Sequence, residues 1–296
     1  CASYGKSVKL TGVDAQYGGG PGYGPYANQW WVPYATRFVD TKTDWYQPKP
    51  TREPGDLVRD PCLTNPAYRQ KVAEDLTRVA ERGLPYSTSD FTLGDENHLV
   101  AGSWDLCFSE TCVADFRRWA QEQYGSLERL NASWGSAYTS WDEVRPGTLE
   151  ECRKTGNYVP WVDHRLHMES VWAGIHSFGR DAIRRVIPTA RVGYEGSDTH
   201  ISSFSGADYW KLASAMDLNN IYYRDFLSLA WHDFAAPDML LGGGWFGGYA
   251  SNRNEFFMRW FPWRTLLKGS NSFWVWCGYG SAGSVMAFDL SLYPFF

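Results

Sequence analysis

Short apolar runs and longer amphipathic segments alternate along this chain. The short runs are bounded by polar or glycine-rich stretches, and the longer segments repeat apolar residues at helical spacing. Runs of the first kind are typical of buried strands, and segments of the second kind are typical of helices. The alternation therefore predicts parallel βα units.

The clearest helix pattern covers 65–82 (NPAYRQKVAEDLTRVAER). Pro66 stands in its first turn, its apolar residues share one face, and Gly83 follows as a stop signal. Other helices are expected over 110–124, 126–134 and 163–186. Strands are expected over 8–13, 86–93, 190–194, 218–223, 238–241 and 272–277.

Polar, aromatic or glycine residues collect directly after these strands, where a (β/α)8 barrel builds its active site. The pattern predicts an α/β fold of the TIM-barrel type, in one domain over 1–296. About six βα units are visible, so the first one or two are expected to lie upstream of this chain or in segments without a recognisable pattern. An open Rossmann-type sheet is the alternative, but the glycines of GGGPGYG (18–24) lead into no helix.

Charge and aromatic content narrow the function. A net charge of −5 and the absence of a Lys/Arg run disfavour nucleic acid and anionic membranes as partners. No apolar run approaches the roughly 20 residues of a membrane span. The 16 Trp, 18 Tyr and 16 Phe often stand beside Gly, Asn or Asp. This pairing suits sugar rings and indicates an oligo- or polysaccharide substrate, although a core of large residues would also account for it.

Two adjacent acids follow the strand expected at 86–93, in the stretch TLGDENHLV (92–100). Glycoside hydrolysis needs one protonated carboxyl group to assist the leaving group and one ionised carboxylate as nucleophile or base. Glu96 is the candidate acid, because the negative charge of Asp95 beside it favours its protonated form. A solvated turn or a helix cap is the competing interpretation.

The run GDENHLVAGSWDLCFSETCVADFRRWAQEQYGSLERLNASWGSAYTSWDEV (94–144) resembles the family 42 glycoside hydrolases, which are β-galactosidases with a (β/α)8 fold. The segment DPCLTNPAYR (60–69) resembles the approach to the same strand. The resemblance implies cleavage of a β-linked glycoside, with a galactoside as the first candidate substrate, and it implies no organic cofactor. It implies that Glu96 is the general acid/base and that Asp95 replaces an Asn that bonds the sugar 2-hydroxyl. Since relatives are often trimers, it also implies a homo-oligomer.

The resemblance further implies a nucleophilic Glu at the end of the seventh strand, but the corresponding stretch MLLGGGWFGGY (239–249) contains no acid. Glu195, in VGYEGSDTH, follows the strand after the acid/base strand and is the best second carboxylate. Asp198 and Asp225 are the runners-up. A hydroxyl ligand or a loop-ordering carboxylate is the competing role for Glu195. A catalytically silent barrel that binds carbohydrate is the alternative function.

Aromatic and polar residues after the strands are the expected walls of a sugar subsite. Side chains alternate along a strand, so Trp274 and Trp276 are expected on one face, where core packing competes for at least one of them. The expected substrate-binding residues are Asp95, Asn97, Asp198, Asp225, Trp245, Tyr249, Trp274 and Trp276.

Cys62, Cys107 and Cys112 match three positions of a cluster that binds zinc in some members of the resembled family, and Ser109 stands at the fourth. A closed structural zinc site normally has four protein ligands, so the missing thiolate weakens this interpretation. A Cys62–Cys107 disulfide or free thiols fit at least as well, and no metal is predicted. Cys1 in place of Met indicates a processed or excised N-terminus, and a secreted or periplasmic location is favoured over the cytoplasm.

Overall fold

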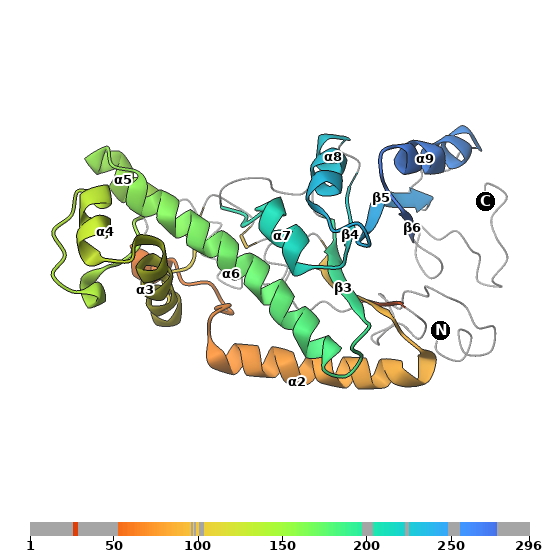
Figure 1. Cartoon of the computed structure of the whole chain (residues 1–296), viewed down its shortest axis with the longest axis horizontal. Helices are drawn as coiled ribbons and strands as arrows, with labels where there is room; N and C mark the ends of the chain where they lie inside the picture. The colour runs from red at the N-terminus through yellow and green to blue at the C-terminus, as the bar shows by residue number, and fades with distance from the viewer. Residues whose placement is uncertain are drawn as a thin grey trace.

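The structure is a computed structural model, which describes residues 26–28, 53–95, 97, 99–100, 104–196, 204–222, 225–247 and 255–276. Within them, six parallel strands form one sheet (Figure 1). The strands are β1 (Tyr26–Asn28), β2 (Asp90–Asp95), β3 (Arg191–Glu195), β4 (Leu218–Asn220), β5 (Leu240–Gly247) and β6 (Ser272–Trp276).

The order of the strands identifies the fold. Each described strand lies beside the one that follows it in the sequence, and the order does not reverse anywhere in the sheet. A doubly wound sheet reverses its order at a switch point, so the Rossmann-type alternative is wrong. Sequential parallel strands joined by helices are the arrangement of a (β/α)8 barrel. The prediction of a TIM-barrel type is confirmed, with the six described strands forming part of a barrel.

Helices connect the strands, and the longest connection lies between β2 and β3. The α-helices are α2 (Pro66–Gly83), α3 (Glu110–Tyr124), α4 (Leu127–Trp134), α5 (Leu149–Thr155), α6 (Val159–Arg184), α7 (Tyr209–Ala215), α8 (Asp225–Phe234) and α9 (Glu255–Leu267). Short 3-10 turns form η3 (Pro54–Asp56), η4 (Leu84–Tyr86) and η5 (Trp141–Glu143). Figure 1 shows α3, α4 and α5 gathered around one end of α6, away from the sheet, while the other end of α6 leads into β3.

Capping residues explain why the two strongest helix predictions hold. The side chain of Asn65 accepts two backbone N–H groups at the start of α2. Ser109 Oγ accepts the N–H of Cys112 at the start of α3, and Gly125, with φ 69°, ends that helix in the left-handed conformation. The bounds predicted for α3 are confirmed, and those for α2 differ by one residue at each end.

Other boundaries were predicted less well. Strand β2 begins at Asp90, four residues after the predicted start, because η4 extends to Tyr86 and Ser87, which follows it, has a φ of 54°. Helix α5 was not predicted. It has only seven residues, too few to show a repeating apolar pattern, and a capping box between Thr148 and Glu151 stabilises its start. Strand β1 was also missed, and the strand expected at 8–13 lies outside the described residues.

Buried apolar side chains form two clusters. The larger one lies between the sheet and its helices and includes Leu76 of α2, Phe91 of β2 and Trp172 of α6. The smaller one lies within the α3–α5 group and includes Phe116 and Trp134. Since α6 borders both clusters, it links the helical group to the sheet that carries the site.

Candidate active site

One residue from each of five neighbouring strands lies at the same level of the sheet. The backbone register pairs Asp95 with Glu195, Glu195 with Asn220, Asn220 with Gly242, and Gly242 with Ser272. We call these five residues the register row. The first three are the last residues of their strands, which is the end of the sheet where parallel barrels place their active sites.

Glu195 is fully buried at the end of β3, with 0% of its surface exposed. Two residues before Glu195, a Cβ at Gly193 would lie 1.7 Å from the carbonyl oxygen of Leu218, so β3 and β4 approach closely. Directly after Glu195, the N–H of Gly196 donates to the carbonyl oxygen of Asn220, also in β4, at 2.8 Å. These contacts fix the backbone around Glu195. Burying a carboxylate is costly, so the position of Glu195 supports either a functional or a loop-ordering role.

Several of the predicted site residues cannot be placed through their side chains. Three lie outside the described residues: Glu96, Asp198 and Tyr249. Asp225 is the first residue of α8. The register sets Trp245 of β5 opposite Trp274 of β6, and Gly247 opposite Trp276. The backbone therefore brings the three tryptophans onto adjacent strands, and their contacts with sugar stay predictions.

Asn97 lies against the helical layer. Its side chain is buried, and its Nδ2 donates to the carbonyl oxygen of Leu93 at 3.4 Å and lies 3.4 Å from Nε2 of His176 on α6. A Cβ at Gly94, which has a φ of 145°, would lie only 2.4 Å from the Asn97 side-chain oxygen. These contacts make Asn97 an anchor for the turn that follows β2. Its predicted role in binding substrate is untested.

Asn220 is a candidate site residue that sequence reasoning missed. It is fully buried at the end of β4 and stands beside Glu195 in the register row. An amide can donate to and accept from sugar hydroxyls. The signal was present in the sequence: two asparagines interrupt the otherwise apolar stretch LNNIYY (218–223). Where a barrel is expected, polar residues at the end of a buried strand are candidate site residues.

His176 couples the Asn97 turn to pH. Burial lowers the pKa of His176 from 6.5 to about 4. With its Nδ1–H assigned as donor to the carbonyl oxygen of Trp172 at 2.8 Å, Nε2 is left to accept from Asn97. Between pH 6.5 and about 4 the unfolded chain binds this proton and the folded chain does not. The contribution of neutral His176 to the free energy of unfolding is therefore fully present above pH 6.5 and is lost as the pH falls toward 4.

We expect the melting temperature to fall as the pH is lowered from 7 to about 4.5, and His176→Gln to reduce the steepness of that fall. The share due to His176 is on the order of 3 kcal/mol, since each unit of pKa is worth about 1.4 kcal/mol. Thermal unfolding followed by circular dichroism at a series of pH values measures both slopes. Burial also lowers the pKa of His164 and His167, so some slope will remain. An unchanged slope in the variant would contradict this assignment.

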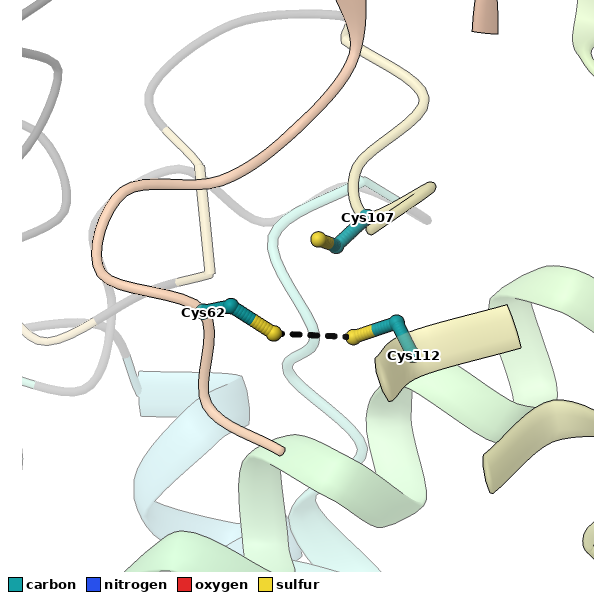
Figure 2. A group of neighbouring side chains, drawn as sticks. All are labelled: Cys62, Cys107 and Cys112. Carbon is teal, nitrogen blue, oxygen red and sulfur yellow. Dashed lines mark hydrogen bonds between the residues drawn. The ribbon is translucent and has the colours of Figure 1, made fainter. Parts of the chain in front are cut away.

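Three thiols from separate segments meet beside the start of α3. Figure 2 shows the sulfur atoms of Cys62 and Cys112 pointing toward each other, with Cys107 beside them. The three Sγ atoms lie within 4.8 Å of one another, and those of Cys62 and Cys112 are 3.5 Å apart. All three residues are buried free cysteines, so the Cys62–Cys107 disulfide alternative is not what the structure contains.

Polar groups surround these thiols. The hydroxyls of Thr64, Ser109 and Thr111 lie 3.0 to 3.2 Å from Cys62 Sγ. Hydrogen bonds from the Cys107 and Cys112 thiols hold the pKa of Cys62 well below its usual range. The fourth position of a tetrahedral zinc site is not filled by sulfur, because Ser109 stands there and its Oγ already caps α3. A closed four-thiolate zinc site therefore does not fit this chain.

Comparison with known proteins gives matches over most of the described residues. The family 42 glycoside hydrolase model, described as "Beta-galactosidase", matches residues 49–233. Beta-galactosidase BgaP of Planococcus sp. (strain L4) is 25% identical over 187 residues, which cover 60% of this chain and 25% of that protein.

Solved structures match at lower identity. The β-galactosidase from Bacillus circulans sp. alkalophilus has a TM-score of 0.58 at 19% identity, covering 78% of this chain and 38% of that one. The exo-carrageenase GH42 from Bacteroides ovatus has a TM-score of 0.59 at 18% identity, covering 78% and 36%. These likenesses support the barrel fold. The chain spans about a quarter of the length of the Planococcus relative. None of the described helices is both long and apolar enough to cross a membrane.

Proposed function

The chain belongs to glycoside hydrolase family 42, and we propose that it hydrolyses β-linked galactosides with two carboxyl groups, Glu96 as general acid/base and Glu195 as its partner. One observation carries the proposal: the register sets Asp95, the residue before Glu96, beside Glu195 at the ends of neighbouring strands. Two acids close together at this end of a parallel sheet are what glycoside hydrolysis needs.

We propose a retaining course for this pair. The carboxyl groups of a retaining pair stand about 5 to 5.5 Å apart. An inverting pair needs about 6.5 to 9.5 Å to admit a water molecule. In the proposed reaction Glu96 protonates the glycosidic oxygen as that bond breaks, and Glu195 attacks the anomeric carbon. Water then releases the sugar, with Glu96 acting as base.

The sugar is proposed from the relatives, and the binding surface from the sequence. The Planococcus and Bacillus proteins are named β-galactosidases, which supports a terminal galactose. The Bacteroides protein is named an exo-carrageenase, so sulfated galactans belong in the test. The adjacent tryptophans of β5 and β6 and the buried Asn220 would supply stacking surface and hydrogen bonds.

We expect the purified chain to cleave 4-nitrophenyl β-galactoside at least about 10-fold faster, in kcat/KM, than the matching β-glucoside, because sites that bond a hydroxyl discriminate against its loss or displacement. Release of nitrophenol across a panel of aryl β-glycosides measures this preference. Release of galactose from β-galactooligosaccharides and carrageenan fragments then tests natural linkages.

A specific observation keeps the silent carbohydrate-binding barrel as the second candidate. Strand β5 (Leu240–Gly247) contains no acid, although the resemblance to the family places the nucleophile at that strand. Binding of galactose by calorimetry, together with no turnover of any substrate in the panel, would favour the silent barrel and overturn the hydrolase.

A further inference from the structure

Asn220 lies next to Glu195 in the register row, on the side away from Asp95. We propose that its side chain binds the 2-hydroxyl of the sugar whose anomeric carbon Glu195 attacks. The site then selects β-glycosides that carry a free 2-hydroxyl and discriminates against 2-deoxy sugars. This inference rests on the proposed glycosidase function and adds the residue that recognises the hydroxyl next to the reacting carbon.

Alternation along β3 and β4 places Asn220 on the same face of the sheet as Glu195. The ring of Tyr194 packs against that of His176 on α6, with their centroids 5.0 Å apart, so Tyr194 faces the helical layer. Successive side chains point to opposite faces of a strand, so Glu195 faces the inner side of the sheet. The register pairs Tyr194 with Asn219 and Glu195 with Asn220. Asn220 therefore shares the inner face with Glu195.

The residues around β4 agree with this assignment of faces. Leu241, which pairs with Asn219, belongs to the larger core cluster between the sheet and its helices. Leu218 is fully buried and is not one of the described residues that form this cluster. Because Leu218 and Asn220 are two positions apart, they point to the same face, opposite to that of Asn219.

The backbone that carries Asn220 is held from both sides. The N–H of Gly196 donates to the Asn220 carbonyl oxygen at 2.8 Å, and the N–H of Ile221 donates to the carbonyl oxygen of Gly242 at 3.1 Å. These bonds join the end of β4 to β3 and to β5. Since Asn220 is also fully buried, its amide is held near Glu195. A group positioned in advance contributes more to a reaction than one that must be ordered during it.

The two proposed catalytic groups leave the β4 side of Glu195 to the sugar ring. Glu96, which protonates the leaving oxygen, directly follows β2 in the sequence, and β2 and β4 lie on opposite sides of β3. The carbon that carries the 2-hydroxyl is bonded to the anomeric carbon, so this hydroxyl comes within reach of a side chain next to the nucleophile. Hydrogen bonds to the 2-hydroxyl strengthen in the transition state, so this contact contributes to kcat.

An amide suits this role better than the other groups of the register row. Asp95 and Glu195, as carboxylates, only accept hydrogen bonds, and Gly242 has no side chain. Ser272 stands on β6, three strands away from β3. The amide of Asn220 can accept the proton of the hydroxyl and can also donate to its oxygen. Asn220 is thus the neighbour of Glu195 in the row that can serve both sides of this hydroxyl.

Turnover of 4-nitrophenyl β-galactoside and of its 2-deoxy analogue by the full chain tests this contact. The parent should cleave the galactoside faster in kcat/KM, and Asn220→Ala should reduce that preference by at least about 10-fold. The loss should fall on kcat for the galactoside, while turnover of the 2-deoxy analogue changes by less than about 2-fold. A side chain that only supports the fold would lower both rates by the same factor.

Asn219→Ala is the matched control. It removes the same side chain from the same strand on the face toward the helices, and it should leave the preference unchanged. Asn220→Leu keeps the size of the side chain without its polar groups, and it replaces Asn220→Ala if thermal unfolding shows that the alanine variant is not folded. The inference is overturned if the Asn220 variants lower both rates equally, or if Asn219→Ala shifts the preference as far.

A parent chain without turnover would contradict the proposed function, and calorimetric binding of galactose and of 2-deoxygalactose then tests Asn220 separately. A preference for galactose that Asn220→Ala removes would support the contact. Equal binding of the two sugars by the parent, or binding of neither, would overturn it.

Discussion

Glu195→Gln is expected to lower kcat on an aryl β-galactoside by at least about 10²-fold, the lower end of what a positioned acid, base or nucleophile contributes. Glutamine keeps the size of the side chain and removes its charge. Glu195 is fully buried at the end of β3. Because glutamine has the same size, the substitution should leave the packing around this position nearly unchanged. Steady-state kinetics with thermal unfolding of the same preparation separate lost chemistry from lost folding.

Companion variants assign the two roles. Glu96→Gln should reduce turnover to a similar extent with poor leaving groups and less with dinitrophenyl galactoside, which needs no proton donor. Glu195→Ala should regain turnover with azide and yield the α-galactosyl azide, since azide then replaces the nucleophile. Glu169→Gln, the same change on α6, should leave kcat unchanged. Full turnover in Glu195→Gln would remove Glu195 from the mechanism and leave Asp198 and Asp225 as the candidates.

Gly193→Ala should prevent folding or cost more than about 4 kcal/mol of stability, which places it among the rare severe substitutions. The new Cβ would lie 1.7 Å from the carbonyl oxygen of Leu218, an impossible contact. That oxygen belongs to the backbone of β4, so relief requires separating two paired strands. The yield of soluble protein and the midpoint of urea unfolding measure the effect.

Gly174→Ala is the matched control. This glycine lies within α6, and an added Cβ would meet nothing within 4 Å. Alanine is the better helix former, so the variant should be as stable as the parent or more stable by up to about 1 kcal/mol. Equal stability of the two variants would show that β3 and β4 are farther apart than described.

The fold could be predicted largely because its helices carry local signals. For α3 the cap, the apolar spacing and the terminal glycine all lie within the same short segment, and its bounds were correct. Strand boundaries were weaker because they depend on neighbours distant in the sequence. Strand β5 continues through glycines that alone suggest a loop, and pairing with β6 keeps them in the sheet. Helix α5 was missed because its main signal is a capping box and not an apolar period.

The sequence could select candidate site residues, but it could not show which of them lie together. The rule that active-site residues follow strand ends selected Glu195 as a candidate, and the register sets it beside Asp95. The same rule could not show that Asn97 packs on His176, 79 positions away in the sequence. The contact of Cys62 with Cys112 likewise joins residues 50 positions apart, so the sequence alone could not decide between a disulfide and free thiols.

The positions of the register row are regularly spaced across the sheet. Strands in a sheet are about 4.8 Å apart, so each step along the row moves a side chain sideways by a nearly constant increment. A carboxylate at position 195 stands one step from Asp95, at position 220 two steps, and at position 242 three steps. Transferring the second acid from Glu195 to position 220 would move it one strand farther from the strand that precedes Glu96, which is the direction that an inverting pair requires. The sheet thus offers graded positions at which the spacing of the two proposed catalytic acids can be varied.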